Sequence, residues 1–281
     1  MKVHMKKVLF ITILCILITG VSACSKENDV VITVYKFLES YPTDKYLMES
    51  NDFVYGARAN PDMFIIDLRE PDEYAKEHIK YSVNIPWGPD LWANIDKIPF
   101  DKPVSVYCES NAKSSQAAAL LALAGFNVKS VEAGWEEGIL NVESVFGIIE
   151  NNPNRFNQVA PPDIKDDFRD AIYKFFKPME EYRDTRFDYY TIYFNDAMML
   201  YEEGDPQFIF LCIDESVQFQ AGPMQGGVNI PFGADMYKDF DSLSKDKVII
   251  VYGEDLQKAG HTTVVLRLLG FDAILTEHKN Y

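Results

Sequence analysis

The sequence predicts an α/β fold made of two tandem copies of one domain, each a mostly parallel sheet flanked by helices. Short apolar runs alternate with helical stretches, which is typical of parallel strands joined by crossover helices. Two windows, 84–126 and 229–271, align without a gap and share 16 identities among 43 positions. Such a match at a fixed offset indicates an internal repeat.

The elements of the first copy follow from its apolar runs and turn residues. We expect, in order, a strand ending at Asp67, a short helix over 70–76, strands near 82–85 and over 104–107, a helix over 114–124 and a strand over 128–131. In the second copy, the apolar run 208–213 predicts a fully buried strand.

These elements divide the chain into four parts. We expect a signal segment over 1–24, a first domain over 36–150, a connector over 151–186 and a second domain over 187–281. The connector begins with loop-forming asparagine and proline residues and then predicts a helix over 163–176. One face of this helix carries Phe168, Ile172, Phe175 and Phe176, so it should pack on one or both copies.

The first 24 residues predict an export signal. Three lysines precede an apolar run over 8–18, which is too short to cross a bilayer, and small residues then lead to Cys24. This order resembles the lipobox of bacterial lipoproteins, which implies lipidation at Cys24. The alternative is an ordinary cleaved signal with an incidental cysteine. The lipobox implies an extracytoplasmic protein anchored by lipid to a bacterial membrane of the cell envelope, and Ser25 permits sorting to an outer membrane.

The chain is strongly acidic, with a formal net charge of −16. Removal of the three signal lysines would bring it to about −19. So acidic a chain is repelled by nucleic acid and by anionic membrane surfaces, and we expect neither as a partner. The spacing of cysteines and histidines gives no metal-ligand pattern, so we expect no metal and no cofactor.

Cys108 is the candidate nucleophile. It stands between the strand 104–107 and a helix, where free backbone N–H groups converge. Those donors, the helix dipole and the cation of Lys113 are expected to favour the thiolate. The alternative is that Cys108 is only a buried structural cysteine. Cys212 is expected to be a small core residue, although a Cys108–Cys212 disulfide remains open for an exported protein.

The first copy resembles the rhodanese domain over residues 40–140. The resemblance rests on the motifs 66–74, 77–79 and 83–86, on the loop that begins at Cys108, and on Gly125–Phe126 and Gly134–Trp135. It implies a sulfurtransferase in which Cys108 takes sulfur from a small, thiosulfate-like donor, holds it as a persulfide and passes it to a thiol or cyanide acceptor. The six-residue spacing from Cys108 to Lys113 resembles that of sulfur-transferring members, whereas phosphatases and arsenate reductases of this fold have a loop one residue longer.

Two departures from the family pattern matter. Tandem members usually carry the working cysteine in the second copy, where this chain has Gly253. Asn111 and Lys113 replace the glycine and arginine that are common in relatives. We therefore expect an inactive second copy that contributes packing and one wall of the substrate cleft, and the sulfur donor stays open.

The resemblance also implies the remaining site residues. The substrate-binding loop is expected to comprise Glu109, Ser110, Asn111, Ala112, Lys113 and Ser114. Lys113 could instead be a surface charge, and the two serines could only cap the helix. Glu109 is expected to point outward, away from the sulfur.

Supporting residues are expected around the loop. Asp67 and Arg69, together with Glu73, should form an ion-pair network, and His78 should pack rather than act as a base. The alternative function is a non-enzymatic, lipid-anchored binding or redox and sulfur-relay protein that uses Cys108 with a partner protein. The acidic loop and the inverted order of the copies favour this alternative, and the intact six-residue loop favours the enzyme.

Overall fold

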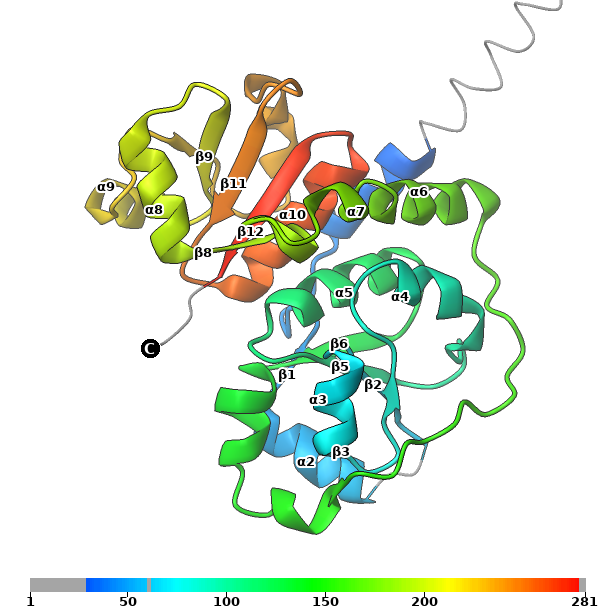
Figure 1. Cartoon of the computed structure of the whole chain (residues 1–281). Coiled ribbons are helices and arrows are strands. Elements are labelled where there is room, and N and C mark those ends of the chain that lie inside the picture. Colours follow the sequence, from blue (N-terminus) through cyan, green and yellow to red (C-terminus); the bar gives the residue numbers. More distant parts are fainter. Residues whose placement is uncertain (1–28, 60–61, 278–281) are drawn as a thin grey trace, which may run out of the picture.

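The computed structural model describes residues 29–59 and 62–277, which form two α/β units with one parallel sheet each (Figure 1). The first sheet has the order β1 (Leu47–Met48), β6 (Val128–Val131), β5 (Val104–Tyr107), β2 (Phe64–Asp67), β4 (Val83–Asn84). The second has the order β8 (Thr191–Tyr193), β12 (Asp272–Glu277), β11 (Val248–Tyr252), β9 (Phe208–Cys212), β10 (Val228–Asn229). The two orders correspond strand for strand, so the sequence repeat is a repeat of topology and the predicted α/β class is confirmed. The first unit also has a short antiparallel pair, β3 (His78–Ile79) and β7 (Ile149–Glu150).

Helices connect and cover the strands. They are α2 (Ser50–Ala59), α3 (Pro71–Lys76), α4 (Pro89–Asn94), α5 (Ala112–Leu123), α6 (Asp166–Phe176), α7 (Met179–Tyr182), α8 (Phe194–Glu203), α9 (Ser216–Ala221) and α10 (Leu256–Leu268). The predicted start of α5 at Ser114 is wrong by two residues, because Asn111 takes a left-handed conformation (φ 89°) and ends the loop early. Lys113 and Ser114 therefore lie in the first turn of a helix.

Alternation along the central strands separates two apolar layers. In β5, Val104 and Val106 face the large core on the α5 side, and Tyr107 faces the smaller cluster beneath α2. The large core continues through the second unit, so both units share one apolar interior. The predicted burial of β9 is only partial, because Phe208 and Ile209 at its start are half-buried.

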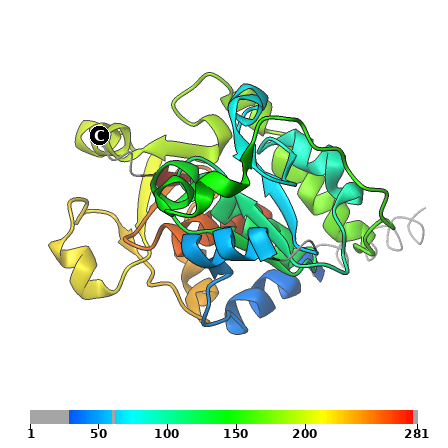
Figure 2. The same cartoon turned by 90° about the horizontal axis from the view of Figure 1, so that it is seen from below.

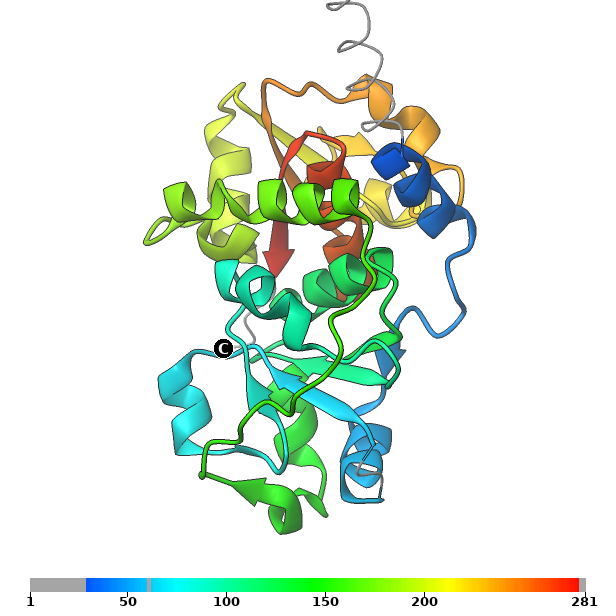
Figure 3. The ribbon, with the colours of Figure 1, turned by 90° about the vertical axis from the view of Figure 1, so that its right-hand side faces the viewer.

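The two units meet along α5 and α10, which lie against each other between the sheets (Figure 3). Gly260 makes this close approach possible, since a Cβ there would lie 2.0 Å from the Ser115 Oγ. The helix that follows the Cys108 loop is thus held by the corresponding helix of the second copy.

The connector helix α6 packs on both units, as its apolar face predicted. Phe176 meets Trp87 of the first unit edge-on at 5.2 Å, and Phe175 meets Tyr190 of the second at 5.4 Å. Viewed from below, the yellow segment with α9 stands out to one side of the molecule (Figure 2).

The predicted signal and Cys24 lie outside the described residues. Within the ranges 29–59 and 62–277, no helix has the length and apolar character needed to cross a bilayer.

Candidate active site

Cys108 lies directly beyond the carboxyl end of β5 and is fully buried. Its Sγ accepts hydrogen bonds from the backbone N–H groups of Asn111 and Ser114, each at 3.3 Å. The Ser114 hydroxyl lies 3.4 Å from the same sulfur. The expected convergence of N–H donors on the sulfur is therefore present, and the N-terminus of α5 faces the thiol.

The start of the loop is fixed from behind by the motif Gly134–Trp135. The Trp135 N–H donates to the Cys108 carbonyl at 2.8 Å. Gly134 has φ 61°, and a Cβ there would lie 2.6 Å from the carbonyl oxygens of Cys108 and Glu109. Only glycine fits this close approach of two backbones.

The groups of Ser114 and the cation of Lys113 favour the thiolate, as expected, but the net shift in the pKa of Cys108 is upward. Burial raises the pKa of Cys108, and the carboxylate of Glu109 raises it further. The Ser114 hydroxyl, Lys113 and the Ser114 N–H oppose the rise without cancelling it. Desolvation penalises the charged form more than these groups repay, so the resting side chain is a thiol.

The Ser114 hydroxyl is arranged to suit that thiol. It donates to Asn111 Oδ1 at 2.9 Å, which leaves its lone pairs to accept from the S–H group of Cys108. A half-turn of the hydroxyl would redirect its hydrogen to a thiolate. Ser114 can therefore serve both protonation states.

Glu109 does not point outward. Its carboxylate pairs with Lys113 Nζ at 3.2 Å, and the ammonium also faces the Tyr189 ring at 4.5 Å. Burial lowers the pKa of Lys113, but Glu109 and Cys108 raise it, and the net shift is upward. Lys113 is thus a largely buried cation that pairs with the Glu109 carboxylate.

Side chains of the second unit contact the Cys108 loop. Ser110 Oγ donates to Glu277 Oε2 at 3.1 Å, and the Asn111 amide donates to Gln257 Oε1 at 3.2 Å. The Tyr189 hydroxyl donates to Glu70 Oε1 at 2.7 Å. Sequence reasoning missed Tyr189, Gln257 and Glu277, because their proximity depends on how the units dock. For Gln257 alone a signal existed, since it aligns with Ala112 of the loop.

Burial dominates the state of Glu277. It raises the pKa of this carboxyl, against the hydrogen bond from Ser110 and the charge of Lys113. Ala112 is fully buried at the start of α5, and its N–H donates to the Ser110 hydroxyl at 3.4 Å.

Asp67 and Arg69 form a buried ion pair beside the loop, as expected. The guanidinium binds both carboxylate oxygens, with 2.6 Å from Nη2 to Oδ2 and 3.0 Å from Nε to Oδ1. Arg69 also lies 4.0 Å from the Trp135 ring centroid. The inclusion of Glu73 is wrong, because Glu73 points to solvent and pairs with Lys76. The pair therefore braces Trp135, which in turn holds Cys108.

His78 packs, as expected. It stacks on Tyr74 with ring centroids 3.7 Å apart, and its Nδ1 meets the Tyr74 carbonyl at 2.7 Å.

Cys212 is a buried free thiol, as is Cys108, so the disulfide alternative is wrong. Strand register places Cys212 at the position that Asp67 has in the first copy. Cys212 lies opposite Tyr252 of β11, as Asp67 lies opposite Tyr107 of β5.

The second loop lacks room as well as a thiol. Gly253 follows β11 as Cys108 follows β5, and a Cβ there would lie 2.7 Å from Ile213 Cγ1 and 2.8 Å from Asp214 Oδ1. The Asp214 carboxylate fills the space and accepts the Glu254 N–H at 3.0 Å. Asp214 stands where the first copy has Arg69, so the local charge is reversed.

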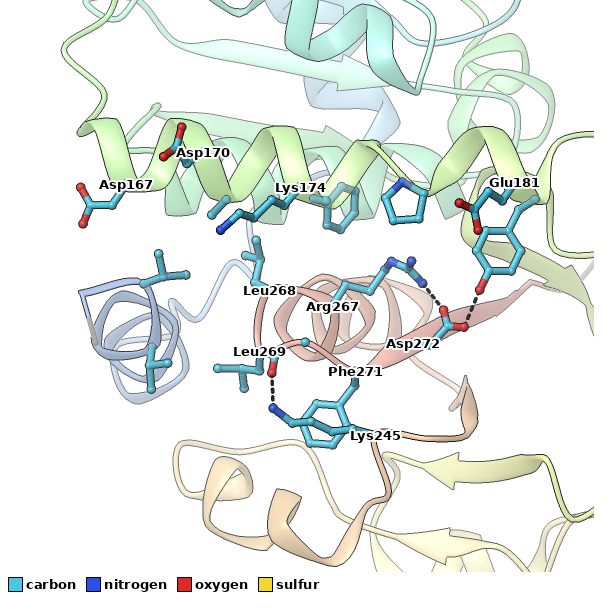
Figure 4. A pocket seen from close by; sticks show the side chains of 17 residues that line it. Asp167, Asp170, Lys174, Glu181, Lys245, Arg267, Leu268, Leu269, Phe271 and Asp272 are labelled. Carbon is cyan, nitrogen blue, oxygen red and sulfur yellow. Dashed lines mark hydrogen bonds and ion pairs between the residues drawn. The ribbon is translucent and has the colours of Figure 1, made fainter. Parts of the chain in front are cut away.

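An open cavity of about 1200 Å³ lies away from Cys108, between α6, α7 and the carboxyl end of α10 (Figure 4). Arg267 and Asp272 pair across its floor at 2.8 Å, and Lys245 donates to the Leu269 carbonyl at 2.7 Å. Among the described residues, no group of three or more His, Cys, Asp or Glu side chains could hold a metal ion.

Residues 50–139, which hold Cys108 and its loop, match the model of the rhodanese-like domain. A thiosulfate:glutathione sulfurtransferase of Saccharomyces cerevisiae is 28% identical over 88 residues, which cover 27% of this chain and 63% of the yeast protein. The uncharacterized protein YqhL of Bacillus subtilis is 36% identical over 75 residues, which cover 25% of this chain and 59% of YqhL. The chain thus spans about three fifths of these curated relatives.

Among solved structures, a thiosulfate sulfurtransferase from Pseudomonas aeruginosa is 16% identical with a TM-score of 0.36. The match covers 89% of this chain and 46% of that protein.

Proposed function

We propose that this protein is a sulfurtransferase that carries sulfane sulfur as a persulfide on Cys108. The observation that carries the proposal is the set of polar groups around Sγ at the N-terminus of α5: two backbone N–H donors, and the Ser114 hydroxyl, which can turn its hydrogen toward a sulfur anion. Such a set stabilises a compact sulfur anion better than a bulky oxyanion. The sulfurtransferase among the curated relatives supports the same chemistry.

The transfer has two displacement steps. Cys108 loses its proton, and the thiolate attacks the outer sulfur of a donor such as thiosulfate. One S–S bond forms as the donor's S–S bond breaks, and sulfite leaves with the electron pair. An acceptor thiolate or cyanide then attacks the outer sulfur of the persulfide and regenerates the Cys108 thiolate. No external oxidant or reductant is needed, and Lys113 and the N–H groups stabilise the negative sulfur in both steps.

Mass spectrometry of the protein after incubation with a sulfur donor tests this proposal. Thiosulfate and a low-molecular-weight persulfide are the two probes. A gain of one sulfur atom on the Cys108 peptide, lost again on addition of cyanide, is expected for the native chain and absent from Cys108→Ser. No gain from either donor would contradict turnover of small donors.

A second candidate is a sulfur or redox relay with a partner protein. Its support is the closure of the site: Cys108 is fully buried, and carboxylates of Glu109 and Glu277 flank its loop. Such a site resists small anions in free solution, and a docking partner could open it. Sulfur loading of Cys108 by a persulfidated protein but by neither small donor would favour the relay.

We further propose that Cys24 is lipidated and anchors the chain to a membrane of the bacterial cell envelope. The support is the order of basic, apolar and small residues before Cys24.

A further inference from the structure

One side chain of the second unit reaches the Cys108 loop from the centre of the interface between the units. Gln257 lies in the first turn of α10, is almost fully buried, and uses both ends of its amide. Its Oε1 accepts from Asn111 Nδ2 at 3.2 Å and from Ser130 Oγ at 2.7 Å. Its Nε2 faces the carbonyls of Lys45 and Tyr46 at 3.1 and 3.2 Å. A fully engaged buried amide is fixed in orientation.

The residue held by Gln257 has a strained backbone. Asn111 has φ 89°, which is uncommon for any residue other than glycine, although asparagine tolerates it best. An external contact can hold such a turn in a residue that carries a side chain, and the Gln257 amide supplies one.

The conformation of Asn111 decides what the sulfur meets. The Asn111 N–H donates to Cys108 Sγ, and Asn111 Oδ1 accepts from the Ser114 hydroxyl. Ser114 in turn contacts the sulfur through its N–H and its hydroxyl. If Asn111 left the left-handed region, its N–H would turn away and Ser114 would lose its partner. The polar contacts to the sulfur in the described part of the chain thus come from Asn111 and from Ser114, its hydrogen-bond partner.

We propose that Gln257 is a positioning residue of the Cys108 site: it holds Asn111 in the left-handed turn and so keeps the N–H groups aimed at the sulfur. The second unit, which lacks a nucleophile, thereby completes the site of the first. The inference deepens the proposed sulfur transfer and rests on it only for the catalytic readout.

Gln257→Met tests the proposal, because methionine keeps the length and volume of the side chain and removes its polar groups. The rate of Cys108 alkylation near neutral pH is expected to fall about two- to tenfold, the range of one neutral hydrogen bond. The pH profile of alkylation should move upward. In donor kinetics kcat should fall by a similar factor, with KM changed less than about twofold. Thr262→Val is the matched control, because Thr262 is buried on the same helix and its hydroxyl donates to the Lys258 carbonyl within that helix.

A merely structural role predicts a different result. If Gln257→Met lowers the melting temperature but leaves the alkylation profile and kcat like those of Thr262→Val, the proposal is wrong. Alkylation does not require sulfur transfer. An absent persulfide would therefore refute the proposed function, whereas an unchanged alkylation profile would refute the positioning role.

Asn111 gives a second test that does not depend on the stability of Gln257→Met. Asn111→Gly and Asn111→Ala both remove the amide that Gln257 holds, but only alanine is strained at φ 89°. Asn111→Ala should therefore be alkylated about tenfold more slowly than Asn111→Gly. In the Asn111→Gly background, Gln257→Met should have little further effect. Equal losses in Asn111→Gly and Asn111→Ala would overturn the proposal.

Discussion

His261→Gln should remove a specific part of the pH dependence of folding. His261 is fully buried between the units, with Nδ1 2.8 Å from the Tyr41 hydroxyl and Nε2 2.9 Å from Gln257 Nε2. Burial lowers the pKa of His261 to about 3, against a smaller effect of Asp255 that raises it. The folded protein therefore keeps a neutral imidazole at pH values where the unfolded chain, with a pKa of about 6.5, binds a proton.

The sign follows from proton binding. Below about pH 6.5 the unfolded state holds more protons at this position than the folded state. The free energy of unfolding therefore decreases as the pH is lowered from about 6.5 to about 3. One pH unit is worth about 1.4 kcal/mol, so the full difference is roughly 5 kcal/mol. The part already felt at about pH 5 is roughly 2 kcal/mol. The contribution is fully present above the unfolded pKa and is lost on acidification.

Urea unfolding at about pH 7.5 and about pH 5 measures this contribution. Glutamine does not titrate, and its carbonyl can accept from Gln257 as the imidazole does. The stability advantage of the native protein over His261→Gln should shrink by roughly 2 kcal/mol between the two pH values. Thr262→Val, a neighbour with no titratable group, should show a constant difference. An advantage that stays constant for His261 as well would refute the buried neutral imidazole.

Three further predictions concern the loops and the anchor. Lys113→Ala should raise the pKa of Cys108 and slow its alkylation near neutral pH by about tenfold, since it removes the cation and leaves the Glu109 carboxylate unpaired. Lys113→Arg should be alkylated at close to the native rate. An unchanged pH profile for Lys113→Ala would show that the loop amides alone stabilise the thiolate. Gly253→Cys in a Cys108→Ser background should not restore sulfur loading, because the new side chain meets Ile213 and a carboxylate; persulfide detected by mass spectrometry at residue 253 would contradict this. Cys24→Ala should release the protein from membranes or block its processing, and complete retention in the membrane fraction would disprove the anchor.

Much of the fold could be predicted from the sequence because its signals are local. The bounds of β5 and β6 agree with the apolar runs that predicted them, and α6 buries the face that its periodicity indicated. The start of α5 could not be predicted from helix propensity, because the left-handed turn at Asn111 is fixed by a contact from the other unit. Local sequence determined the elements, and docking of the units set this boundary.

The site was predictable to the level of its loop. Cys108, Ser114 and the pair of Asp67 with Arg69 lie where the motifs indicated. The protonation state of the sulfur was not predictable, because it is the balance between complete burial and a few donors. Motif order fixes the donors, but the surroundings of the loop also include side chains of the second unit, such as Tyr189 against Lys113, which no motif identifies.

The differences between the two loops suggest why the second copy persists without a nucleophile. The second copy has Gly253 in place of a cysteine, and the same segment contacts the first unit. Asp255 binds Lys45 of the first unit at 2.6 Å, and Gly260 allows α10 to lie close to α5. Gln257 of the same segment contacts the Cys108 loop. The loop of the first copy therefore surrounds a sulfur with N–H donors, whereas the corresponding segment of the second copy is used for contacts with the first unit.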